Sequence, residues 1–564
     1  MIVVFLYMVG QGLHSGSNIW LSFWSDYNQN HTQSDVTSKL GFYLGIYAGL
    51  GGVECLMEFF RDFLLFSFCA RASRVLHERL LGSVMRSPMS FFDTNPTGRI
   101  VNRFSADIDK IDLTIPFLIA DFFFCVCEVV AIIAIISYST PRFLYVIVPL
   151  FIIYFFIQRY YIKSSRQLKR LESISKSPIF SHFTESVTGA ITIRAFSQSN
   201  RFSNESEAKV DGNVRCNYYN YCSNRWLAIR IETLGNIIIF FAALFAILDR
   251  ENLTPGKAGL SISYAMQITD TLTWMVRMLC DLETNCVALE RVLEYIKGNP
   301  QEADWEGFEY TDKHLENWPS KGCIELENYE TRYRPGLDLV LRGINLTVGS
   351  EKKVGICGRT GAGKSSLTLA LFRIIEPTLG QIIIDGKNIS KLGLHQLRSR
   401  LTIIPQDPVL FTGNVRFNLD PTEEHNDEEL WRALEHAHLK NHIKILDGGL
   451  EHEVTEGGSN FSVGQRQLMC LARALLRKTK ILVLDEATAA IDMETDDLIQ
   501  KTIRREFKEC TVITIAHRLN TILDSDAIAV LSHGKLIEFD RPATLLGRED
   551  SALRSMAKDA NIAF

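Results

Sequence analysis

The chain has 564 residues and a formal net charge of −5, and 46% of its residues are hydrophobic. At about 100–200 residues per domain, this length predicts more than one domain. The apolar content excludes a disordered chain, and the near-neutral charge gives no support for nucleic acid as a partner. Of the 34 Phe, 26 lie before residue 291. We therefore expect a membrane part followed by a soluble part.

The first half holds six mainly apolar segments, each near the length of about 20 residues that a helix needs to cross a bilayer. The loops after the second and fourth segments are rich in Lys and Arg. Basic loops stay cytoplasmic, so we expect both termini inside and a multi-pass protein surrounded by membrane lipid. The expected location is the plasma membrane, which the charge pattern does not itself identify. The segments are Ile2–Trp24, Leu40–Phe68, Pro116–Ser137, Phe143–Tyr160, Leu227–Leu248 and Ala258–Cys280.

Two N-x-[ST] sequons fall in the short loops expected on the outer side. They make Asn30 and Asn252 candidate glycosylation sites. Prolines and charges indicate a linker at 298–320, between a membrane domain at 1–297 and a soluble domain at 321–564.

The strongest motif of the second half is Gly358–Ser365, which matches GxxxxGK[ST] in full. It follows a β-like run and opens a helix-like run, the context of a phosphate-binding loop. Lys364 would neutralise the β- and γ-phosphates of ATP, while the Ser365 hydroxyl would bind Mg²⁺. The residues expected to hold the nucleotide here are Gly358, Thr360, Gly361, Gly363, Lys364, Ser365 and Ser366.

A second strand-like run, Ile481–Leu484, ends in two carboxylates. Asp485 suits Mg²⁺ ligation, and Glu486 can polarise the attacking water as a general base. Two acids after a strand are weak support alone. Together with the phosphate loop they predict a nucleotide hydrolase.

The segment Asn460–Gln467 resembles the signature sequence of ABC transporter ATPases. This resemblance implies an ABC-exporter fold, a membrane α-helical bundle of six helices followed by an α/β P-loop ATPase domain. It also implies that Tyr333 stacks on adenine, that Gln406 contacts Mg²⁺, and that His517 contacts the γ-phosphate as a catalytic residue. In that family the signature faces the ATP of a partner domain, here through Ser462, Val463, Gly464 and Gln465.

The match is closer still to subfamily C, the multidrug resistance-associated proteins. It rests on Tyr333–Leu341, Leu394–Arg398 and Ser164–Ser173 among other runs, and it corresponds to the second half of such a protein. A second ABC half is therefore the expected partner. Val463 replaces a signature Gly and restricts the backbone, which implies poor hydrolysis of the ATP that faces it.

Charged groups in membrane helices generally face a cavity or a partner. By resemblance, Arg225, Trp274 and Arg277 bind conjugated organic anions, such as glutathione, glucuronide or sulfate conjugates and drugs. The alternative interpretation is structural: the Trp anchors its helix at the membrane interface, and the Arg side chains extend from the helices toward water. Asp270 departs from the family pattern and predicts altered selectivity, with tolerance of cationic or zwitterionic groups.

The sequence therefore predicts an ATP-hydrolysing exporter of amphipathic organic anions. Three alternatives stay open: a regulator of a partner channel, a gated anion channel of the same subfamily, and an inactive half-length product.

Overall fold

The computed structural model describes the chain apart from residues 32, 250, 252, 308–314, 316, 487–492, 517 and 560–564, and apart from the side chains at 30, 33, 34 and 493–497. The described residues form two compact units. One comprises Met1–Met85 and Pro96–Asn299, and the other comprises Arg86–Asn95 and Pro300–Phe564. We call them the helical unit and the ATPase-fold unit.

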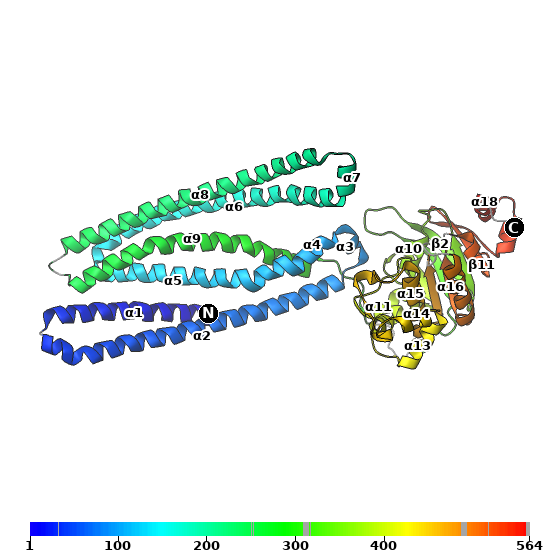
Figure 1. Ribbon diagram of the computed structural model, residues 1–564, viewed down its shortest axis with the longest axis horizontal. Coiled ribbons are helices and arrows are strands. Elements are labelled where there is room, and N and C mark those ends of the chain that lie inside the picture. Colours follow the sequence, from blue (N-terminus) through cyan, green and yellow to red (C-terminus); the bar gives the residue numbers. More distant parts are fainter. Residues whose placement is uncertain are drawn as a thin grey trace. The chain divides into compact units, whose positions relative to one another are not determined.

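The helical unit is built from six long helices in its described residues. The helices α1 and α2 pack along each other, as do α5 and α9, and α6 and α8 (Figure 1). Most of these helices extend well beyond the apolar segments expected from the sequence, because helical periodicity continues through the polar loops. Their bounds are α1 Ile2–Asn30, α2 Gln33–Met85, α5 Ile115–Ser139, α6 Leu144–Thr188, α8 Ser199–Leu248 and α9 Pro255–Gly298.

Four segments of the described chain are long and apolar enough to cross a membrane. The helices α1 and α9 are not among them, although both were expected to span. Polar side chains such as His14 and Asn18 in α1, and Asp270 and Arg277 in α9, interrupt their apolar residues. The four segments are Asp35–Met85, Thr97–Ser139, Pro141–Thr188 and Ser199–Leu248.

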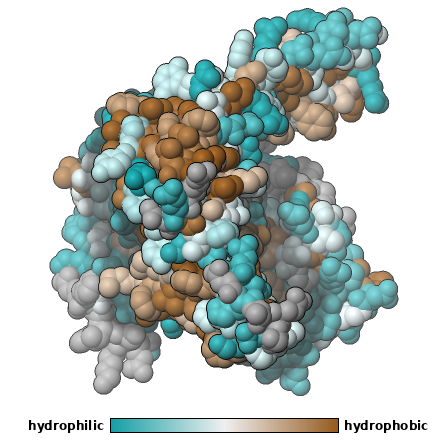
Figure 2. Space-filling view, turned by 90° about the vertical axis from the view of Figure 1, so that its left-hand side faces the viewer, coloured by the Kyte–Doolittle hydropathy of each residue, from teal (hydrophilic) through white to brown (hydrophobic). Residues whose placement is uncertain are grey.

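The outer surface of the helical unit is hydrophobic over broad areas. Figure 2 shows patches of brown side chains on the face that it presents, and Phe151, Phe155 and Phe156 of α6 are all about half exposed or more. Apolar surface on this scale marks contact with lipid or another protein.

Short helical segments connect the long helices. They are α3 Met89–Thr94, α4 Thr97–Asn102, π-helical turns at Arg103–Asp107 and Lys110–Thr114, a 3₁₀ turn at Pro141–Phe143, and α7 Ala190–Ala195.

The ATPase-fold unit is centred on a six-stranded sheet with the order β12-β11-β3-β10-β9-β6. All neighbouring strands in it are parallel except β11 and β12. Four strands of this sheet are nearly continuous apolar runs, as expected for parallel strands that are buried on both faces. The bounds are β3 Lys353–Cys357, β6 Leu401–Ile404, β9 Ile481–Asp485, β10 Thr511–Ile515, β11 Ala527–Ser532 and β12 Lys535–Asp540.

A second, antiparallel sheet has the order β2-β1-β4-β5, and a small ribbon pairs β7 with β8. One apolar core joins residues of the two main sheets and α10, and another lies among α13, α15 and β9. The remaining strands are β1 Ile324–Thr331, β2 Leu341–Val348, β4 Pro377–Ile384, β5 Lys387–Asn388, β7 Gly413–Asn414 and β8 Glu453–Val454. The helices are α10 Lys364–Leu371, α11 Leu394–Arg398, α12 Val415–Leu419, α13 Asp427–His436, α14 Lys440–Ile445, α15 Val463–Arg477, α16 Met493–Glu506, α17 Pro542–Gly547 and α18 Ala552–Asp559.

This arrangement confirms the expected fold class, a helical membrane part followed by an α/β ATPase domain.

Candidate functional site

The phosphate loop lies between β3 and α10, where the sequence places it. Two of its glycines hold conformations that a side chain would disturb. A Cβ on Gly358 would lie 2.3 Å from the carbonyl oxygen of Leu531, and Gly363 has φ +98°. The loop therefore keeps its backbone N–H groups free of side-chain cover at the start of α10, where the helix dipole favours an anion.

Lys364 begins α10 and is only 7% exposed. Its Nζ donates a hydrogen bond to the Gly358 carbonyl at 2.9 Å and lies 4.0 Å from Glu486 Oε1. A buried ammonium group needs such compensation. A bound phosphate, which carries more negative charge than these partners, can stabilise the same ammonium group. Lys364 is therefore already in position to bind a phosphate.

The carboxylates that the sequence predicts lie beside this loop. Asp485 ends β9, and its Oδ1 accepts a hydrogen bond from Ser365 Oγ at 3.3 Å. Burial raises the pKa of the Asp485 carboxyl and Glu486 acts in the same direction, while the Ser365 hydrogen bond and the Lys364 charge oppose the shift. A carboxylate and a hydroxyl that face each other are suitable ligands for Mg²⁺.

Glu486 has an unusual backbone conformation for a residue that is not glycine, with φ +48°. Its N–H donates to the Ile515 carbonyl on β10 at 3.0 Å, which fixes this strained residue at the strand end, and its side chain is 7% exposed. Strained, buried carboxylates beside a phosphate loop are typical of catalytic positions.

The other predicted nucleotide residues are placed in different ways. Tyr333 is 38% exposed, and its hydroxyl forms a 2.7 Å hydrogen bond with Ser366 Oγ at the loop. Thr360 and Gln406 are exposed. His517 lies outside the described residues.

The signature segment begins α15. Ser462 is the N-cap of this helix, and its Oγ accepts from the Gln465 N–H at 3.2 Å, while Gln465 Oε1 accepts from the Ser462 N–H at 2.9 Å. This capping box leaves Val463 39% exposed at the first helical position, followed by Gly464. The signature segment thus exposes a helix N-terminus, which is suited to bind an anionic group of a partner.

A short segment from the first half of the sequence belongs to the ATPase-fold unit. The Arg86 carbonyl accepts from the Glu302 N–H at 2.7 Å, and the Arg86 guanidinium lies 4.8 Å from the ring centroid of Trp305. Glu302 in turn accepts two hydrogen bonds from Arg398, at 2.9 and 3.0 Å. Part of the expected linker is therefore fixed against α11.

The predicted substrate residues do not all line the same cavity. Trp274 and Asp270 of α9 line a cavity of about 390 Å³ between α5 and α9, whereas Arg225 and Arg277 do not line it. Arg225 is exposed, and Arg277 is partly buried. Of the predicted glycosylation sites, Asn252 and the Asn30 side chain lie outside what the structure describes.

Sequence reasoning missed four polar residues of this cavity, Asp121, Glu128, Gln267 and Thr271. The signal that could have revealed them is a pair of carboxylates inside the apolar run Pro116–Ser137. Charged residues within such runs are rare and mark functional positions.

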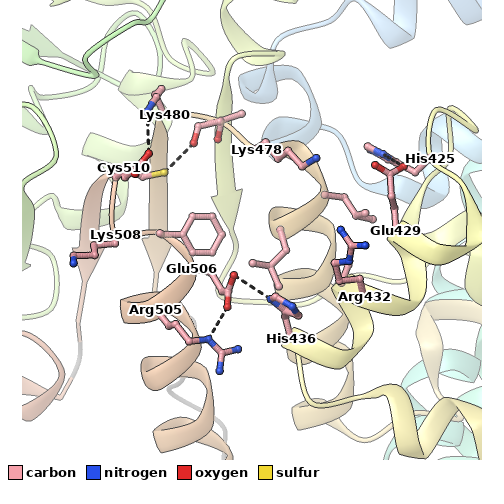
Figure 3. Close-up of a pocket in the computed structure, with 16 residues that line it drawn as sticks. His425, Glu429, Arg432, His436, Lys478, Lys480, Arg505, Glu506, Lys508 and Cys510 are labelled. Atoms are coloured by element: carbon pink, nitrogen blue, oxygen red, sulfur yellow. Dashed lines mark hydrogen bonds and ion pairs between the residues drawn. The ribbon is translucent and has the colours of Figure 1, made fainter.

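Another cavity, of about 550 Å³, lies in the ATPase-fold unit between α13 and the C-terminal ends of α15 and α16 (Figure 3). Glu506 accepts from Arg505 at 2.6 Å and lies 3.0 Å from His436 Nδ1, and His425 pairs with Glu429 at 3.4 Å. These polar groups pair with one another, and the cavity shares no lining residue with the predicted nucleotide site.

Comparisons with known proteins agree with both units. Residues 1–272 match the family model of the ABC transporter transmembrane region, and residues 341–489 match the model of the ABC transporter. The chain is 50% identical to ATP-binding cassette sub-family C member 2 of Mus musculus over 99% of its own length, and 52% identical to sub-family C member 3 of that species over 97%. It is 50% identical to member 3 of Homo sapiens over its whole length. In each case it spans 36% of the relative.

Proposed function

The chain belongs to the ABC transporters, with close similarity to subfamily C, and on this premise we propose that it uses ATP to export amphipathic organic anions across a membrane. The observation that carries the proposal is the convergence of two strand ends at the phosphate loop. There Ser365 Oγ lies 3.3 Å from Asp485, and Lys364 Nζ lies 4.0 Å from Glu486.

The donor set fits ATP and Mg²⁺. A buried cation, a hydroxyl–carboxylate pair and a glycine-rich loop at a helix N-terminus match a nucleotide phosphate with its metal. Ser365, Asp485 and Gln406 would hold Mg²⁺, which supplies charge neutralisation for the phosphates. Glu486 orients the attacking water and accepts its proton, Lys364 stabilises charge on the phosphoryl oxygens, and His517 contacts the γ-phosphate.

A second ABC half would supply the other membrane domain and the other nucleotide-binding domain of the transporter. The exposed N-terminus of α15, with Ser462, Gly464 and Gln465, is the surface that meets the ATP of that half. Val463 makes hydrolysis there slow, so the ATP held by Lys364 is the one that drives turnover. The helical unit lies in lipid, in the plasma membrane, with the nucleotide domain in the cytoplasm.

Export is tested by uptake into inside-out vesicles that contain the chain together with its partner half. We expect ATP-dependent, uphill accumulation of a glutathione conjugate, lost in Lys364→Ala, with Lys444→Ala on the remote helix α14 as the matched control. A channel regulator or a gated anion channel would hydrolyse ATP without uphill accumulation. That result would overturn the export proposal but leave the nucleotide site intact.

A further inference from the structure

The cavity between α5 and α9 has an unusual lining for a membrane helix pair. Its volume of about 390 Å³ falls in the usual range of small-molecule sites. Carboxylates at three positions share it with aromatic, thioether and amide groups, and among the residues that the structure describes no Lys, Arg or His lines it. The lining residues used here are Asp121, Phe124, Glu128, Gln267, Asp270 and Trp274.

Glu128 is an unusual residue for this position, because a glutamate in a membrane helix is here only 7% exposed. It accepts a hydrogen bond from the Gln267 amide, which is neutral. In the described part of the chain no cationic side chain pairs with Glu128, Asp121 or Asp270. A buried carboxylate without a counter-charge is unfavourable, so a cation that enters the cavity offsets that penalty.

The apolar lining determines what kind of cation fits. Trp274 is 53% exposed and lies one helical turn from Asp270, so its indole ring and the carboxylate share one helix face. Aromatic faces attract organic cations more strongly than hydrated metal ions, because an organic cation sheds its water easily. Phe124 adds apolar surface from α5.

We propose that this cavity binds the cationic part of an amphipathic molecule, with Glu128 and Asp270 as counter-charges and Trp274 as the aromatic contact. Gln267 is a positioning residue, because it orients the Glu128 carboxylate through its amide. The inference rests on the proposed transport function and extends it. Since Arg225 and Arg277 do not line the cavity, the site accepts organic cations or zwitterions that the arginines alone would repel.

The test is equilibrium binding of radiolabelled tetraphenylphosphonium to the purified chain in nanodiscs, without nucleotide. Tetraphenylborate, of similar shape and opposite charge, is the matched probe. We expect saturable binding of the cation only. Asp270→Asn, on an exposed side chain, should weaken it about threefold, and Glu128→Gln about tenfold. Glu232→Gln, at an exposed position on α8 that does not line the cavity, should bind like the parent.

Equal binding of the two probes would overturn the inference, as would parent-like binding in Asp270→Asn, a variant that leaves the buried packing intact. Binding of a fluorescent ATP analogue is measured on the same preparation. If the parent chain binds ATP but not the cation, this inference alone is refuted, whereas a parent chain that binds the cation but not ATP refutes the proposed function alone.

Discussion

Replacing Tyr333 by Ala tests the assignment of this residue to the adenine ring. The side chain is 38% exposed, and its hydroxyl is already bonded to Ser366 beside the phosphate loop. A ligand base can therefore stack on the ring without displacing protein groups. Removing the ring removes that contact and leaves the phosphate-binding groups in place.

The size of the effect follows from the exposed area. A Tyr side chain has about 200 Å² of surface, so the exposed part is about 75 Å². A base covers one face, roughly half of that area. At about 25 cal/mol per Å², the stacking is worth about 1 kcal/mol, which corresponds to a weakening of ATP affinity of about fivefold.

The assay is displacement of a fluorescent ATP analogue from the purified chain. Tyr333→Phe keeps the ring but loses the hydrogen bond to Ser366, and we expect it to bind ATP within about twofold of the parent. Inorganic triphosphate, which has no base, should bind the parent and Tyr333→Ala equally. The reasoning is refuted if Tyr333→Ala binds ATP like the parent, or if Tyr333→Phe loses as much affinity as Tyr333→Ala.

Three further outcomes are expected. Glu486→Gln should lower phosphate release in the assembled transporter by about 100-fold or more while ATP binding persists, with Glu428→Gln on α13 as control; near-normal turnover would exclude Glu486 as the base. Ser462→Ala removes the cap of α15 and should cost about 1 kcal/mol, seen as faster amide exchange over residues 463–466, whereas Ser462→Thr should retain most of the protection. Asp485→Asn should raise the thermal midpoint of the nucleotide-free chain near pH 7 and weaken Mg²⁺-dependent nucleotide binding. The sign follows because burial raises the folded-state pKa of Asp485, so its ionisation opposes folding above the unfolded pKa of about 3.9. The gain should disappear below that pH, and an unchanged midpoint at pH 7 would contradict the explanation.

The sequence was informative about the nucleotide part because its motifs are local. A glycine-rich loop between a strand and a helix specifies its own backbone, so the place of Lys364 was predictable within a residue. That Glu486 lies 4.0 Å from Lys364 depends on the strand order, in which β10 separates β3 from β9. Spacing along the chain does not encode that order. The roles assigned to these residues stay predictions until the variants are measured.

The membrane part was predictable in outline only. Apolar runs gave the helices but not their ends, since the helices continue into polar sequence. The cavity between α5 and α9 arises where two helices far apart in the chain pack together. The sequence pointed to Trp274 through the family resemblance and to Asp270 through its departure from the family pattern, yet Glu128 joins them only through tertiary packing.

The short segment Arg86–Asn95 has a consequence for how the protein is made. Because it clusters with residues 300–564, the ATPase-fold unit is discontinuous along the chain. Arg86 is synthesised before Glu302 and Trp305, and its contacts with them can form only after the intervening helices have been synthesised. A recombinant fragment that begins at residue 300 would lack the guanidinium over Trp305 and the acceptor for the Glu302 N–H. We therefore expect substitutions within this segment to impair folding of the ATPase-fold unit.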